Sequence, residues 1–77
     1  MNKDRRDAIS KIIAQINDLR TEVETLRDEE QEYKDNMPEN MQSGEKGDAA
    51  DAAIQALDEA VSNIESAESS LDEAIAA

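Results

Sequence analysis

The sequence lacks most of the residue types on which small proteins build active sites. It has no cysteine, no histidine, no tryptophan and no phenylalanine, and a single tyrosine. Without cysteine there are no disulfide bonds, thiolate metal sites or cysteine nucleophiles. Without histidine, the commonest general base and the commonest transition-metal ligand are missing. These absences argue against most enzyme classes.

Carboxylates are plentiful, but their spacing matches no metal or phosphate motif. The run DEEQE at 28–32 lacks the D-x-D-x-D-G spacing of a calcium loop. A di-metal carboxylate bundle would require Glu-x-x-His pairs. The segment SGEKG at 43–47 lacks the spacing of a phosphate-binding loop. We expect a protein that is not an enzyme and that uses no cofactor or metal.

Basic residues are scarce: 8 Lys and Arg stand against 20 Asp and Glu, which gives a formal net charge of -12. Direct binding to nucleic acid is disfavoured because it needs basic side chains facing the phosphates. An acidic surface can instead bind a basic protein partner, or serve solubility alone. A DNA mimic matches only loosely, since acids seven residues apart on a helix are about 10.5 Å apart, against about 3.4 Å for phosphates.

Long hydrophobic runs are also missing. No apolar run approaches the roughly 20 residues that span a membrane. The start MNKDRRDAIS is charged and has no hydrophobic segment behind it, unlike a secretory signal. We expect a cytoplasmic protein that does not insert into a membrane.

The large apolar residues that are present recur in alternating steps of three and four. In the first half this a/d heptad pattern predicts a helix from about 4 to 36. Ile13 widens its apolar stripe at an e position. A second heptad stretch predicts a helix from about 48 to 76, with alanine at every g position. The predicted core residues are Ile9, Ile12, Ile16, Leu19, Val23, Leu26, Tyr33, Ile54, Leu57, Val61, Ile64, Leu71 and Ile75.

Residues 37–47 separate the two predicted helices and contain the only proline and both glycines. These residues break helices, so one continuous helix is disfavoured. The prediction is an all-α fold: residues 1–77 form a single antiparallel two-helix hairpin resembling a coiled coil.

The charges on one flank support a particular register. If Val23 faces Ile64, the e positions of the two helices pair with opposite sign. The predicted pairs are Arg20 with Glu65, Arg27 with Asp58 and Lys34 with Asp51. Glu30 and Glu68 fall at core-type a positions, where each carboxylate needs either a wet edge or a partner from another subunit.

The other flank is small on the second helix and would allow another helix to approach closely. We predict an oligomer face that contains Ile13, Ala53, Ala60, Ala67 and Ala74. Two helices that bury one stripe each form a marginal core, so we expect homodimerisation into a four-helix bundle.

The connector contains a distinctive run, MPENMQ. Together with Tyr33 and Glu45, and followed by the alanine-rich heptads from Ala49 to Val61, this run resembles short acidic proteins encoded in phage and prophage genomes. The resemblance implies a viral origin, hence the cytoplasm of a host cell, and no particular activity. The run is more specific than a connector requires, which makes it a candidate partner-binding loop: Met37, Pro38, Glu39, Asn40, Met41 and Gln42.

Two functions remain open from the sequence. The first is a self-associating protein-interaction or assembly module. The second is an acidic inhibitor or DNA mimic that blocks a basic site on a host or defence protein. The acids of the second helical stretch, with no basic residue after Lys46, are the feature that would serve the second function.

Overall fold

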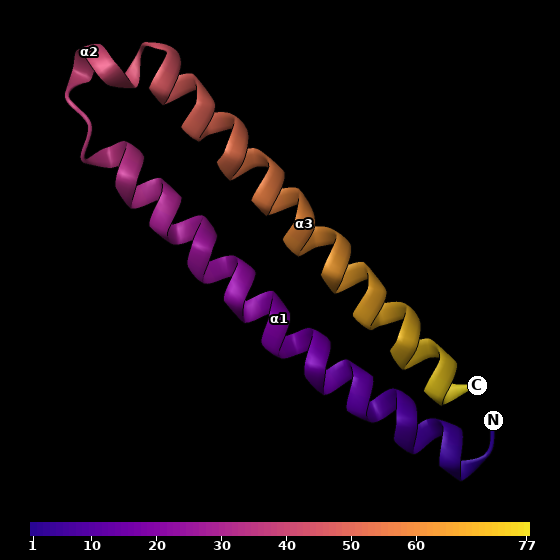
Figure 1. Cartoon of the computed structure of the whole chain (residues 1–77). Helices are drawn as coiled ribbons and strands as arrows, with labels where there is room; N and C mark the ends of the chain where they lie inside the picture. Colours follow the sequence, from indigo (N-terminus) through magenta and orange to yellow (C-terminus); the bar gives the residue numbers. More distant parts are fainter.

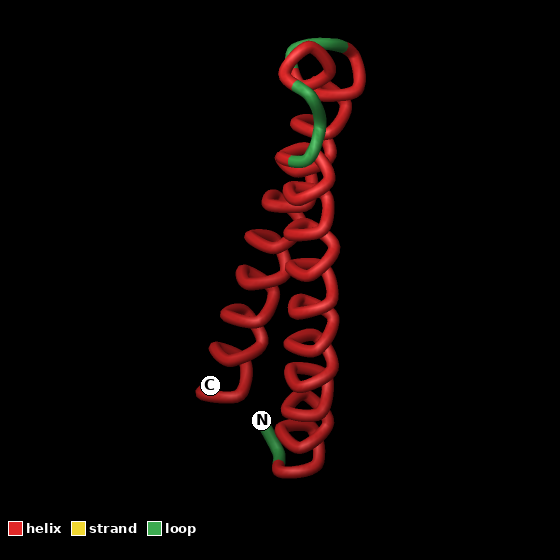
Figure 2. Tube along the Cα trace, turned by 90° about the vertical axis from the view of Figure 1, so that its left-hand side faces the viewer, coloured by secondary structure: helices red, strands yellow, loops and turns green.

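A computed structural model describes all residues, Met1–Ala77, and contains only helices. These are α1 (Lys3–Asp35), α2 (Glu39–Gln42) and α3 (Glu45–Ala76). The two long helices lie side by side in opposite directions, with α2 at their shared end and both termini at the other (Figure 1). A second view shows them inclined to each other (Figure 2). The molecule is strongly elongated, 58 × 15 × 12 Å. None of its helices combines the length and the hydropathy that a membrane span requires.

Local signals at both ends of α1 explain its bounds. The side chain of Asn2 caps its start, because Asn2 Oδ1 accepts a hydrogen bond from the backbone N–H of Arg5 at 2.8 Å. Asp4 lies in the first turn, near the positive end of the helix dipole, and Lys34 lies in the last turn. Pro38 disfavours helical geometry at Met37, so α1 ends at Asp35, close to the predicted position.

The connector is held to α1 by one side-chain amide. Nε2 of Gln42 donates to the carbonyl oxygen of Met37 at 3.0 Å and to that of Lys34, in the last turn of α1, at 3.3 Å. The side chain of Met37 is buried. Two residues of the predicted partner-binding loop are therefore committed to the fold, and the specificity of the MPENMQ run has a structural reason. Pro38, Glu39 and Asn40 are exposed.

The second long helix begins at Glu45, three residues before the predicted start. Gly44 is its N-cap residue, and Gly47 lies inside its first turn. At Gly47 the helix passes so close to the connector that a Cβ atom would lie 1.8 Å from the carbonyl oxygen of Gln42. Gly47 is thus required by close backbone approach rather than by a break in the helix.

The tightest packing lies at the connector end. Only Met37, Gly47, Ala50 and Ile54 are buried, and no side chain elsewhere along the hairpin is enclosed to the same degree. The remaining apolar side chains that pack between α1 and α3 are half-buried. Two helices alone therefore leave most of their apolar stripe in contact with solvent.

Candidate functional site

The apolar stripe of α1 divides into two rows. One row is half-buried against α3 and includes Ile9, Ile13, Ile16 and Val23. The other row is exposed, with 43–55 % of each residue accessible, and consists of Ile12, Leu19, Leu26 and Tyr33. The prediction that these four residues belong to the hairpin core is wrong. They form a line of large apolar side chains at seven-residue spacing that faces solvent.

Three of the exposed residues are each followed by a basic residue that reaches toward α3. Arg20, Arg27 and Lys34 each lie about 100° further around the helix than the residue before them. Their long side chains reach acids on α3. The a positions of α1 (Ile9, Ile16 and Val23) and its e positions (Ile13, Arg20, Arg27 and Lys34) face α3. The d positions, which are the four exposed residues, therefore face solvent. Ile13, which the sequence placed on the oligomer face, is half-buried and belongs to the row that packs against α3 rather than to the exposed row.

Two of the predicted ion pairs are present. Nε of Arg27 donates to Oδ1 of Asp58 at 2.8 Å, and Nζ of Lys34 contacts Oδ1 of Asp51. The hydrogen bond to Asp58, and then its charge, raise the pKa of the Arg27 guanidinium above the ordinary value. The contribution of this cation is therefore fully present at neutral pH and is lost only as the pH rises through the raised pKa.

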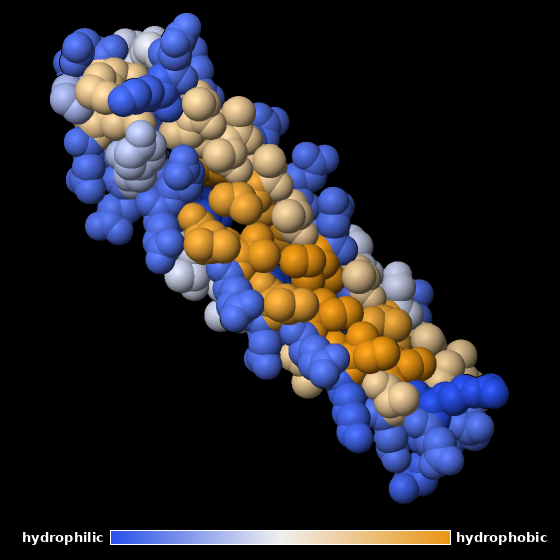
Figure 3. Space-filling model, in the orientation of Figure 1, coloured by the Kyte–Doolittle hydropathy of each residue, from blue (hydrophilic) through white to orange (hydrophobic).

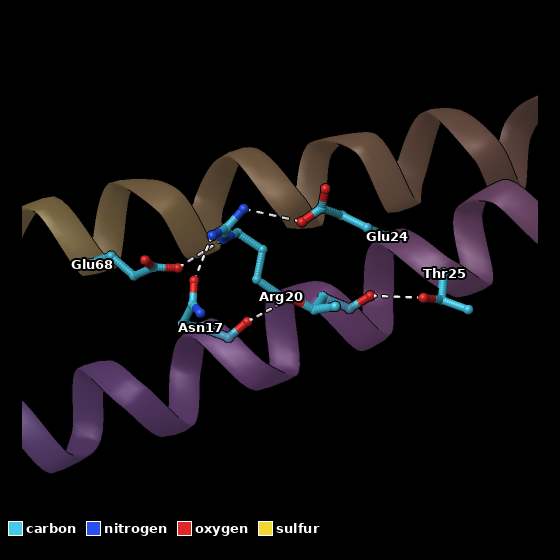
Figure 4. Close-up of polar contacts among 6 residues, drawn as sticks. Asn17, Arg20, Glu24, Thr25 and Glu68 are labelled. Atoms are coloured by element: carbon cyan, nitrogen blue, oxygen red, sulfur yellow. Dashed lines mark hydrogen bonds and ion pairs between the residues drawn. The ribbon is translucent and has the colours of Figure 1, made fainter.

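The third predicted pair is wrong in its partner. Arg20 extends across to Glu68 rather than Glu65, and its Nε donates to Oε1 of Glu68 at 3.0 Å (Figure 4). The same guanidinium also donates to Glu24 and Asn17 on α1. The hydrogen bond to Glu68 raises the pKa of Arg20, against a smaller opposing effect of desolvation.

Burial explains why Arg20 binds Glu68. The Glu68 side chain is only 18 % exposed, so its carboxylate has lost much of its water and needs a partner. Arg20 supplies that partner from within the chain, whereas the sequence predicted a wet edge or a second subunit. Glu30, the other acid at a core-type position, is half-buried and forms no ion pair.

Exchanging the charges of one pair tests this register. Arg27→Glu places a third acid beside Asp28 and Asp58 and is expected to lower the melting temperature. Adding Asp58→Arg restores a pair of opposite sign, so the double variant should melt above the Arg27→Glu variant, with the difference shrinking in high salt. Thermal unfolding followed by circular dichroism measures both. Additive losses from the two substitutions would contradict the pairing.

On α3, the exposed row of α1 adjoins the alanine row. In an antiparallel pair, the flank of α1 opposite its ion pairs lies on the same side as the g positions of α3. These are Ala53, Ala60, Ala67 and Ala74, of which Ala67 is exposed and the others are half-buried. Figure 3 shows the result: a hydrophobic band runs along one side of the hairpin between hydrophilic margins.

We call this band the open face and define it by two rows. The α1 row is Ile12, Leu19, Leu26 and Tyr33, and the α3 row is Ala53, Ala60, Ala67 and Ala74. The ion pairs cover the other side of the seam between the helices. The surface is not hollowed into a pocket, so the open face is the candidate site, and it presents shape and hydrophobicity rather than reactive groups.

A comparison with protein-family models, with curated proteins and with solved structures finds no match to this chain.

Proposed function

We propose that this chain is a non-enzymatic protein-interaction or assembly module that self-associates through the open face into a four-helix bundle. The observation that carries the proposal is the row of exposed large apolar residues on α1. Scattered exposed leucines are ordinary on protein surfaces, but a contiguous apolar band with polar margins is typical of an interaction site.

The accessible surface supports a partner of substantial size. A folded monomer of 8.5 kDa is expected to expose about 4,700 Å². The chain exposes 5545 Å², about 850 Å² more than that expectation. A stable protein interface buries about 800 Å² on each partner. Covering the open face would therefore bring the chain close to the surface of an ordinary folded protein.

Mass in solution tests the proposal. Sedimentation equilibrium on the purified chain at micromolar concentration should give twice the monomer mass of 8.5 kDa. Since each copy has a net charge of -12, salt screens their repulsion, and the dimer should become tighter as salt is added. A monomer at all salt concentrations would refute self-association.

The alternative, an acidic inhibitor of a basic site, receives less support from the geometry. Asp51, Asp58 and Glu68 are held by basic residues of α1 and are not free for a partner. Capture by electrostatics would also weaken with salt, whereas association through the open face strengthens. The complexes that the two functions would form, a dimer of this chain or a complex with a basic protein, are therefore expected to respond to salt in opposite directions.

A further inference from the structure

We infer that the occupant of the open face is a second copy of this chain, related by a two-fold axis parallel to the helices, so that α1 of each copy covers α3 of the other. This arrangement rests on the proposed function and goes further. It places both connectors at the same end of the bundle. The other face-to-face arrangement has its axis perpendicular to the helices, stacks α1 on α1 and puts the connectors at opposite ends.

The first support is complementarity of size. The ion pairs Arg27–Asp58 and Lys34–Asp51 fix which residues of α1 and α3 stand level. In that register each large residue of the α1 row stands level with one alanine of the α3 row: Ile12 with Ala74, Leu19 with Ala67, Leu26 with Ala60 and Tyr33 with Ala53.

An axis parallel to the helices keeps those levels unchanged. Each large side chain would therefore meet an alanine of the second copy, and the four such layers are repeated by symmetry. Alternation of large and small residues across facing positions lets layers interdigitate at the density of a protein interior. Stacking α1 on α1 would instead bring large residues against large ones and alanines against alanines.

The second support is charge along the margins of the open face. On the α1 side the margin carries the exposed residues Gln15, Glu22 and Glu29. On the α3 side it is uncharged: Ala49, Ala56, Asn63 and Ser70. Packing α1 over α3 lays each acidic margin along a neutral one. With α1 over α1, the two margins that carry Glu22 and Glu29 would instead lie along each other, and like charges brought side by side oppose association.

Distances between spin labels distinguish the arrangements, and the absence of cysteine allows single attachment sites. Asn40→Cys labels the exposed connector, and Ser10→Cys labels the exposed start of α1. With both connectors at one end, each labelled homodimer should show a distance between its two spin labels of about 30 Å or less, given helices packed 8–10 Å apart. Heterodimers carrying one Asn40→Cys and one Ser10→Cys chain should show a much longer distance, approaching the 58 Å length of the hairpin.

The outcomes separate the two levels of the proposal. A dimer with long distances in both homodimers and a short one in the heterodimer would overturn the arrangement and leave self-association standing. A monomer by sedimentation before labelling would overturn both and leave the open face to a different protein. Circular dichroism on each labelled variant confirms that the helices are retained.

Discussion

Replacing Leu19 and Leu26 together with glutamate is expected to leave the chain monomeric. Both residues lie at the centre of the open face and are 55 % exposed in the single chain, so the hairpin loses little from their replacement. In the dimer each would be enclosed. Losing two buried leucines costs at least about 4 kcal/mol, which weakens the dissociation constant about a thousandfold or more.

The measurement has a matched control. Ala14→Glu with Thr21→Glu adds the same charge to α1 at exposed positions away from the open face, and this variant should remain a dimer. A further readout is the melting temperature, which rises with protein concentration only when folding is coupled to association. If the Leu19 and Leu26 variant keeps the dimer mass and a concentration-dependent melting temperature, the open face is not the interface.

Replacing Gly47 with alanine is expected to destabilise the fold, although alanine is the best helix former. Alanine gains about 1 kcal/mol of helix propensity over glycine. That gain is outweighed because the new Cβ would lie 1.8 Å from the backbone oxygen of Gln42, which must move. Overpacking of this kind costs about 1–3 kcal/mol or more. We expect a net loss of about 2 kcal/mol and a fall in melting temperature of about 10 °C.

The other glycine provides the control. A Cβ at Gly44 would meet the carbonyl oxygens of Asn40 and Met41 at 3.5 Å and 3.6 Å, which is ordinary contact. Gly44→Ala should change the free energy of unfolding by about 0.5 kcal/mol, the typical effect at an N-cap without a side-chain hydrogen bond. Urea titration of both variants at one protein concentration makes the comparison. Equal effects of the two substitutions would contradict the close approach at Gly47.

The heptad pattern alone was enough to predict two long helices, and opposite charges were enough to predict the pairs Arg27–Asp58 and Lys34–Asp51. It was not enough to predict which side of α1 faces α3. The apolar stripe of α1 spans the a, d and e positions, which is wider than one neighbouring helix can cover. The heptad pattern does not indicate which part of the stripe remains open, whereas the structure shows Ile12, Leu19, Leu26 and Tyr33 exposed.

The packing of the connector could not be predicted from the sequence either. Glycine and proline mark breaks in helices, so the sequence alone predicts that Gly47 belongs to the loop. Its role depends on how closely the start of α3 passes the backbone of Gln42, a distance between segments that local patterns do not encode. The hydrogen bonds from the Gln42 amide to the carbonyls of Lys34 and Met37 likewise form only when the connector folds back on the end of α1.

The position of the chain ends has a practical consequence. Met1 and Ala77 lie at the end of the hairpin remote from the connector (Figure 1). In the inferred bundle all four ends of the two copies would lie together at that end. A flexible linker from Ala77 of one copy to Met1 of the next would then join both hairpins into one polypeptide without crossing the open face. Such a tandem chain would contain two hairpins in every molecule. A reporter fused to it would lie at the end of the bundle that carries the chain termini and would leave the connectors at the other end free.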